Sequence, residues 1–297
     1  MLSLCGVINL RARKRQTIII AVLFLFVPLT LLCIFTYYPI IRGIILSFSD
    51  YNMFTKKTTW VGLRNYKEIF QNKYFYEALR NIFKYLIVVP LIQFTAILTA
   101  VLVNQDIPGI KFFRTLFYVP VITGSVIVSM TWRWIYNVDG LLNSFLLSTG
   151  VIKEPIMWLT DERFALYSVM FVTFWRGIGY YMVIYLAGLQ NIPSELYEAA
   201  RIDGANARQI LARITLPLLR PTMLFCFTIS SLAALKVFEE VFLMTQGGSG
   251  TTTMMYLIYD YAFVRFKFGL STATSVVFAG ILIVFTAINF KFFGPKR

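Results

Sequence analysis

Six long apolar segments, separated by shorter polar ones, make up most of the chain. Each is about 18 residues or longer, enough for a helix to cross a hydrocarbon core of ~30 Å. The pattern predicts an all-α membrane protein whose six transmembrane helices form one domain over residues 17–293. The predicted spans are residues 17–40, 81–103, 113–135, 164–190, 222–245 and 270–291.

The composition supports a membrane protein. Hydrophobic residues make up 58% of the chain and charged residues 14%, whereas soluble domains average about 45–50% and about 25%. The first apolar run is too long for a signal peptide and lacks a small-residue cleavage site, so we expect it to stay as the first span. Residues 1–16 then form a basic cytoplasmic tail.

The distribution of Lys and Arg gives a modest indication of orientation. With the amino terminus inside, thirteen of these residues lie in the predicted inner segments and nine in the outer ones, which is the direction of the positive-inside rule. Both termini are then cytoplasmic. The net charge of +14 is better explained by topology and by contacts with anionic membrane lipids than by nucleic-acid binding.

The sequence lacks the residues of most catalytic sites. It has no histidine, which removes His-based acid–base and nucleophilic catalysis and HExxH zinc sites. It also has no GxxxxGK[ST] phosphate loop, so we do not expect the chain to hydrolyse ATP itself. Its three widely spaced cysteines suggest neither a disulfide framework nor a metal site. We therefore expect a protein that transports or holds something, with no catalytic residue and no metal ligand.

One polar, amphipathic stretch, residues 191–221, interrupts the apolar pattern. We expect two short helices here. The first would be capped by Ser194, carry Glu195 in its first turn and end at Gly204 in a left-handed turn. The dipeptide at 216–217, Leu-Pro, would break the second helix before the next span. An ordinary hairpin at the membrane interface is the alternative interpretation.

The sequence EAARIDGANARQILARITLP within this stretch resembles the EAA loop of the membrane subunits of binding-protein-dependent ABC importers. The resemblance implies the type I importer permease fold, with residues 191–221 as a cytoplasmic coupling loop. A helix that begins near Glu195 would seat in a groove of a separate ATPase, and Glu198 would pair with a basic residue there. The motif positions are Glu198, Ala199, Ala200, Asp203, Gly204, Ala205, Ile214, Leu216 and Pro217.

The resemblance covers roughly residues 35–292 and is closest to the sugar-importing branch of the family. It includes WVGLRNYKEIF at 60–70, DGLLNSFLLSTG at 139–150 and VFEEVFLMTQGGSG at 237–250. One departure is Ser249, because many relatives carry proline after the paired glycines. The shape of this outer turn is therefore left open.

The resemblance implies one permease subunit of a carbohydrate importer in a bacterial or archaeal cytoplasmic membrane. A second, similar permease would share the pathway, and an external binding protein would deliver the solute. Two cytoplasmic ATPase subunits would bind the ATP and Mg²⁺, so this chain would be no enzyme and would need no cofactor. A polyol, glycerol phosphate or another small solute is the alternative cargo. An ion-coupled secondary carrier, which also places carboxylates in the membrane, is the alternative class.

Charged and aromatic residues inside two spans are the candidate substrate pathway, because charges in a span usually face the bundle interior or a water-filled cavity. Lys236 and Glu240 could instead neutralise each other four residues apart on one helix, and the aromatic rings could simply pack the bundle. Rings, carboxylates and a guanidinium together would suit a sugar. The candidates are Trp175, Arg176, Tyr180 and Tyr181 in the fourth span and Lys236, Glu239 and Glu240 in the fifth.

Overall fold

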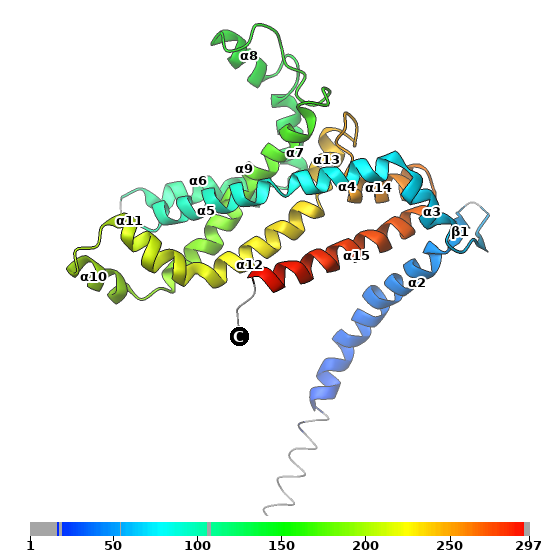
Figure 1. Cartoon of the computed structure of the whole chain (residues 1–297), viewed down its shortest axis with the longest axis horizontal. Helices are drawn as coiled ribbons and strands as arrows, with labels where there is room; N and C mark the ends of the chain where they lie inside the picture. Colours follow the sequence, from blue (N-terminus) through cyan, green and yellow to red (C-terminus); the bar gives the residue numbers. More distant parts are fainter. Residues whose placement is uncertain (1–16, 18–19, 54, 106–107, 294–297) are drawn as a thin grey trace, which may run out of the picture.

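The computed structural model describes residues 17, 20–53, 55–105 and 108–293. The predicted basic tail, residues 1–16, lies outside the described residues. The described chain is predominantly helical, with one short two-stranded hairpin (Figure 1). Its elements, in chain order, are η1 (Cys33–Tyr37), α2 (Tyr38–Ser47), β1 (Ser49–Asn52), β2 (Lys57–Trp60), α3 (Arg64–Gln71), α4 (Lys73–Tyr85), α5 (Val88–Val103), α6 (Ile110–Ile122), α7 (Ser125–Ile135), α8 (Leu141–Ser148), α9 (Ala165–Gln190), α10 (Ser194–Ile202), α11 (Ala207–Ile210), η2 (Leu211–Thr215), α12 (Leu216–Leu235), α13 (Glu239–Met244), α14 (Met254–Tyr259), η3 (Asp260–Val264) and α15 (Phe268–Phe293).

Five helices of the described chain are long and apolar enough to cross a membrane, and a bent helix pair supplies a sixth crossing. Because every peptide N–H and C=O must be satisfied within the hydrocarbon, continuous helices are the structure that such sequences adopt there. The six-helix fold class is therefore confirmed. The long helices are Ile20–Ser47, Lys73–Val103, Ala165–Gln190, Ala207–Met244 and Phe268–Asn289, and the bent pair is Ile110–Ile122 with Ser125–Ile135.

The third crossing differs from the single helix expected over residues 113–135. The helices α6 and α7 meet at an angle of 96°. Pro120 lies inside α6 and has no N–H to donate to the preceding turn. Thr123 and Gly124 then take extended backbone conformations, with ψ of 129° and 138°. The apolar composition predicts a membrane span here but carries no information about this bend.

The fifth crossing is also interrupted. The helix α12 ends at Leu235, and α13 begins only at Glu239. The alternative interpretation, in which Lys236 and Glu240 neutralise each other on one helix face, is therefore wrong, because no continuous helix joins the two residues. Near its other end, the helix does continue through Pro217, where a break was expected. The π-helical turn η2 allows this, since the Leu216 N–H reaches back five residues to the Leu211 carbonyl.

The core of the molecule is the contact between α5 and α9, with α12 packed against both. Two glycines of α9 make close approach possible, because a side chain at Gly177 would overlap Ile92 and one at Gly179 would overlap the backbone carbonyl of Phe117 in α6. A buried polar chain also crosses the three helices. The Tyr185 hydroxyl donates to Gln93 Oε1 (2.5 Å), and Gln93 Nε2 donates to Ser230 Oγ (2.8 Å).

The hairpin and the short helices α10 and α11 lie at opposite ends of the molecule. Figure 1 shows α10 and α11 at one end and β1, α3 and α14 at the other, with α8 projecting beyond α7. The antiparallel strands β1 and β2 pair Ser49 with Trp60 and Asn52 with Lys57. Asn65 of α3 holds the start of the hairpin, since its Nδ2 donates to the carbonyls of Ser47 (2.9 Å) and Ser49 (3.0 Å).

Candidate functional site

Backbone hydrogen bonds fix the turn after α10. Gly204 takes a left-handed conformation with φ of +77°, as predicted. The Ala205 N–H donates to the Ala200 carbonyl (2.9 Å), and the Gly204 N–H donates to the Arg201 carbonyl (3.1 Å). This pair of bonds is the Schellman motif, which satisfies carbonyls that a helix end leaves free. The turn therefore holds its shape through its own bonds.

The start of each short helix is organised differently. Ser194 is the first residue of α10 and makes no capping bond, so its predicted capping role is wrong; Pro193 stands at the N-cap. In α11 the cap is complete. The Gln209 N–H donates to Asn206 Oδ1 (3.0 Å), and the Asn206 N–H donates to Gln209 Oε1 (2.8 Å). This capping box satisfies two free N–H groups and fixes the second helix directly after the turn.

The helix α10 leaves its side chains unburied. No residue of α10 is buried; Leu196 is 43% exposed and Ile202 is 86% exposed. Glu195, Glu198 and Ala199 are exposed as well. A hollow of about 290 Å³ opens beside them, lined by Ala200, Asp203, Gly204 and Ala205 together with residues of α11 and η2. Leu216 and Pro217 are partly buried where α12 begins. The motif residues thus form a rigid, exposed surface with a recess.

A second hollow, of about 390 Å³, lies within the helix bundle. Its walls come from α5, α6, α9, α12 and α13. Arg176 of α9 and Glu240 of α13 face each other across it and form an ion pair, with Nη1 and Oε1 3.7 Å apart. Its polar lining consists of Thr173, Arg176, Tyr180, Tyr181, Ser230 and Glu240.

The structure therefore brings four of the seven predicted pathway residues to one cavity and leaves three out of its lining. Trp175 packs edge-on against Trp132 of α7, with ring centroids 5.5 Å apart. Lys236 and Glu239 are exposed at the helix break. Trp175 therefore packs within the bundle, as the alternative interpretation has it.

Comparison with known proteins places the chain in a family. The family described as "binding-protein-dependent transport system inner membrane component" matches residues 66–294. This chain belongs to that family. The permease is therefore a multi-pass membrane protein and a transporter component.

Individual relatives cover almost the whole permease. The probable ABC transporter permease protein YurN of Bacillus subtilis (strain 168) is 34% identical over 284 residues, 94% of this chain and 97% of that protein. The lactose transport system permease protein LacF of Rhizobium radiobacter is 34% identical over 282 residues, 93% of each chain. A crystal structure of a bacterial ABC transporter that imports the acidic polysaccharide alginate matches the fold with a TM-score of 0.83, 24% identity and coverage of 96% and 98%.

Two cavity residues of the permease were missed at the sequence level. Ser230 is held by Gln93 (2.8 Å), and Thr173 shares a hydrogen bond with the Tyr85 hydroxyl (2.7 Å). Gln93 lies in an apolar span, and a polar side chain there is itself a sign of an interior partner. The position of Gln93 in its span could be read from the sequence, whereas its contact with Ser230 could not.

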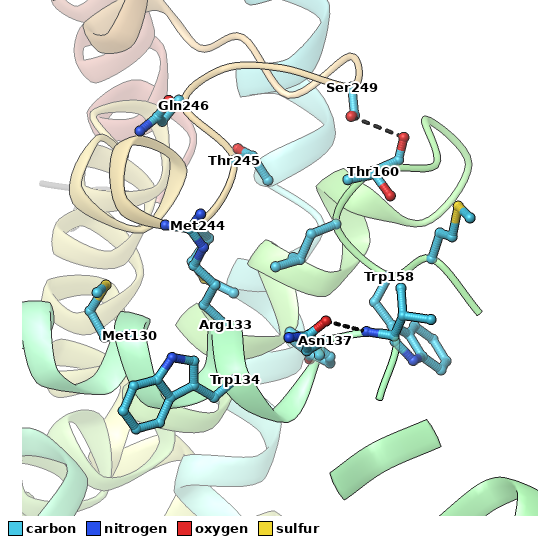
Figure 2. A pocket seen from close by; sticks show the side chains of 14 residues that line it. Met130, Arg133, Trp134, Asn137, Trp158, Thr160, Met244, Thr245, Gln246 and Ser249 are labelled. Atoms are coloured by element: carbon cyan, nitrogen blue, oxygen red, sulfur yellow. Dashed lines mark hydrogen bonds between the residues drawn. The ribbon is translucent and has the colours of Figure 1, made fainter. Parts of the chain in front are cut away.

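A third hollow, of about 510 Å³, lies where α7, residues 157–160 and the turn after α13 meet (Figure 2). Between this hollow and α9, Asp161 and Arg163 form an ion pair. The Arg163 side chain and N–H both donate to the Asp161 carboxylate, and these bonds hold the pKa of that carboxyl below its usual range.

Proposed function

We propose that this permease is the membrane-spanning subunit through which an ABC importer moves a carbohydrate into the cell by alternating access. The observation that carries the proposal is the exposed, self-supported turn from Glu195 to Ala205. It holds the family motif residues at one end of the bundle, where no residue of α10 is buried by the rest of the described chain. A surface of this kind suits a partner protein that binds it and transmits a conformational change through it.

A cytoplasmic ATPase is the partner that we propose for this surface. Glu198 would pair with a basic residue of the ATPase, and the exposed apolar side chains Leu196 and Ile202 would become buried in its groove. ATP and Mg²⁺ would be bound by two such ATPase subunits and not by the permease. The turn would then lie in the cytoplasm, together with both chain termini.

A second permease and an external binding protein would complete the importer. The second permease, similar to this one but a separate chain, would share the translocation pathway. The name of the LacF relative supports a sugar as cargo. The cavity supports it too, because Tyr rings together with the Arg176–Glu240 pair offer apolar faces and hydrogen-bonding groups to a polyhydroxylated solute.

Alternating access would follow from the two states of the ATPase dimer. Closure on ATP draws the coupling turns together and opens the cavity outward, and hydrolysis returns it to the inward state. Such coupling requires that the ATPase bind the two permease states with different free energies. The turn at Gly204 and the continuous helix that follows it are the elements that transmit this difference.

The test is ATP-driven uptake by the complete importer in proteoliposomes, with a panel of labelled lactose, maltose, cellobiose, xylobiose and arabinobiose. Glu198→Ala should abolish most uptake and weaken capture of the ATPase in a pull-down. Glu154→Ala is the matched control, because Glu154 is an exposed carboxylate far along the chain from the turn.

The outcomes separate the alternatives. Uptake that survives ATP depletion but collapses with the ion gradient would identify a secondary carrier. ATP-dependent uptake of a polyol or glycerol phosphate in place of every panel sugar would identify another cargo. Full ATPase capture and uptake by Glu198→Ala would contradict the proposed role of the turn.

A further inference from the structure

The hollow between α7, residues 157–160 and residues 244–249 is separate from the cavity that holds Arg176 and Glu240. It lies at the amino-terminal end of α9, whereas α10 follows the carboxyl-terminal end of that helix. Its volume of about 510 Å³ is within the range of small-molecule sites, about 300–1,000 Å³. It is therefore large enough for a sugar of one or two rings.

Aromatic side chains from two segments line this pocket (Figure 2). Trp134 is 73% exposed and presents its ring at the rim (Figure 2). Trp158 is held in place, since its Nε1 donates to Asn143 Oδ1 (2.9 Å) and its ring lies 6.1 Å from that of Tyr136. Indole and phenol rings offer flat apolar surfaces that need little rearrangement on binding. Such surfaces complement the C–H faces of a pyranose.

Hydrogen-bonding groups line the same pocket. Arg133 donates from Nη1 to the Leu243 carbonyl at 3.5 Å, and no carboxylate of the described residues forms an ion pair with it. Asn137 Oδ1 accepts from the Val138 N–H (2.7 Å), and the Asn137 NH₂ group makes no hydrogen bond among the residues that the structure describes. Gln246 is exposed at the same pocket. A guanidinium and two amides can bind several hydroxyls.

The turn that carries Gln246 and Ser249 is strained and tightly held. Both residues have positive φ, +51° and +53°, a conformation that non-glycine residues adopt at a free-energy cost and that is concentrated at ligand-binding sites. Asn81 donates to the carbonyls of Gly250 (2.8 Å) and Thr252 (2.9 Å). The Ser249 hydroxyl donates to the Thr160 carbonyl (3.0 Å). The Asn81 bonds hold the turn on α4, and the Ser249 bond joins it to the pocket segment at residues 157–160.

We propose that this pocket is a carbohydrate-binding site of the permease, additional to the membrane cavity. A sugar ring packs against Trp134, and its hydroxyls bond to Arg133 and Gln246. The site rests on the proposed function, since the transported carbohydrate is its occupant. It holds the sugar between release from the binding protein and entry into the cavity.

The test measures binding of each panel sugar to the complete importer in lipid nanodiscs, with the binding protein and ATP left out. Trp134→Ala should weaken binding by about tenfold or more, as removal of an aromatic anchor does. Gln246→Gly should weaken it as well, and it keeps the positive φ because glycine adopts that conformation freely. Trp60→Ala is the matched control, since Trp60 is 69% exposed on β2 and stacks on Phe48, away from the pocket.

Absence of binding by every panel sugar would overturn the proposal, and so would equal binding by Trp134→Ala and Trp60→Ala. If Trp134→Ala instead loses capture of the binding protein while sugar binding is unchanged, the pocket is a docking surface and the proposal is wrong. Normal uptake without any pocket binding leaves the proposed function standing. If a sugar binds the pocket but no sugar is taken up, the proposed cargo is contradicted and the proposed binding site stands.

Discussion

Arg176 of α9 and Glu240 of α13 lie 3.7 Å apart across the cavity, although 64 positions separate them in the sequence. The pair joins the fourth crossing to the fifth just beyond the point where the fifth is broken. The side chains are 31% and 14% exposed, so water screens the pair only in part. Its contribution to stability should therefore fall between those of exposed and fully buried pairs.

Removal of either charge should leave the other without a partner. We expect Arg176→Gln and Glu240→Gln each to lower the free energy of unfolding by about 1–2 kcal/mol. The double variant should have a free energy of unfolding no lower than that of the less stable single variant, because the two substitutions remove the same interaction. Thermal unfolding of the purified variants measures this, and strictly additive losses would show that the charges act independently.

Gly179 should tolerate no side chain. A methyl group there would overlap the Phe117 carbonyl of α6, so Gly179→Ala should destabilise the permease by about 1–3 kcal/mol. Gly280→Ala in α15 is the control, since nothing lies within 4 Å of that position and alanine favours helix by up to about 1 kcal/mol. Unfolding midpoints should move in opposite directions. Equal midpoints would mean that α6 does not pack on α9 at this point.

Gly204 should be required for its backbone conformation alone. A side chain at this position meets nothing within 4 Å, but φ is +77°. Gly204→Ala should therefore strain the turn by about 1–2 kcal/mol and weaken capture of the ATPase. Gly204→Asn should be milder, because asparagine adopts the left-handed conformation more readily. ATPase yields that fall in the order wild type, Gly204→Asn, Gly204→Ala would support this prediction. The reverse order would show that the side chain at position 204, and not the backbone conformation, decides capture.

Ser249 should be intolerant of proline. Proline fixes φ near −65°, whereas Ser249 has φ of +53°. Ser249→Pro should rearrange the turn and increase amide hydrogen exchange over residues 245–252. Ser249→Gly should keep the turn and lose only the bond to Thr160, worth about 1 kcal/mol. Equal exchange in the two variants would show that this turn does not depend on a positive φ.

Local patterns predicted the helices, and the pairing between helices came only from the structure. Apolar segment length was enough to find the crossings, and Gly204 was recognisable because a left-handed turn favours glycine. The pairing of Lys236 with Glu240 failed because helix spacing assumes a continuous helix, and α12 ends before it reaches them. The partner that Glu240 does have, Arg176, lies on another helix and follows from packing, which no local pattern encodes.

The aromatic residues show the same limit. Tyr180 and Tyr181 line the cavity, whereas Trp175 in the same predicted cluster packs on Trp132. A helix turns by about 100° per residue, so neighbours in sequence face different surroundings. Which direction is interior depends on where the other helices pack. The pocket beside Trp134 was missed for a related reason, since its walls come from three segments that are distant in the sequence.

The helix from Ala207 to Leu235 connects the turn at Gly204 directly to the break beside Glu240. At 1.5 Å per residue, these 29 residues extend for about 43 Å. A helix of that length acts as a lever: a tilt of about 5° at the motif end displaces the far end by roughly 3.7 Å. That displacement is as large as the separation of Arg176 and Glu240. A small rotation of the turn at Gly204 is therefore enough to separate the two charges and change the shape of the cavity between them.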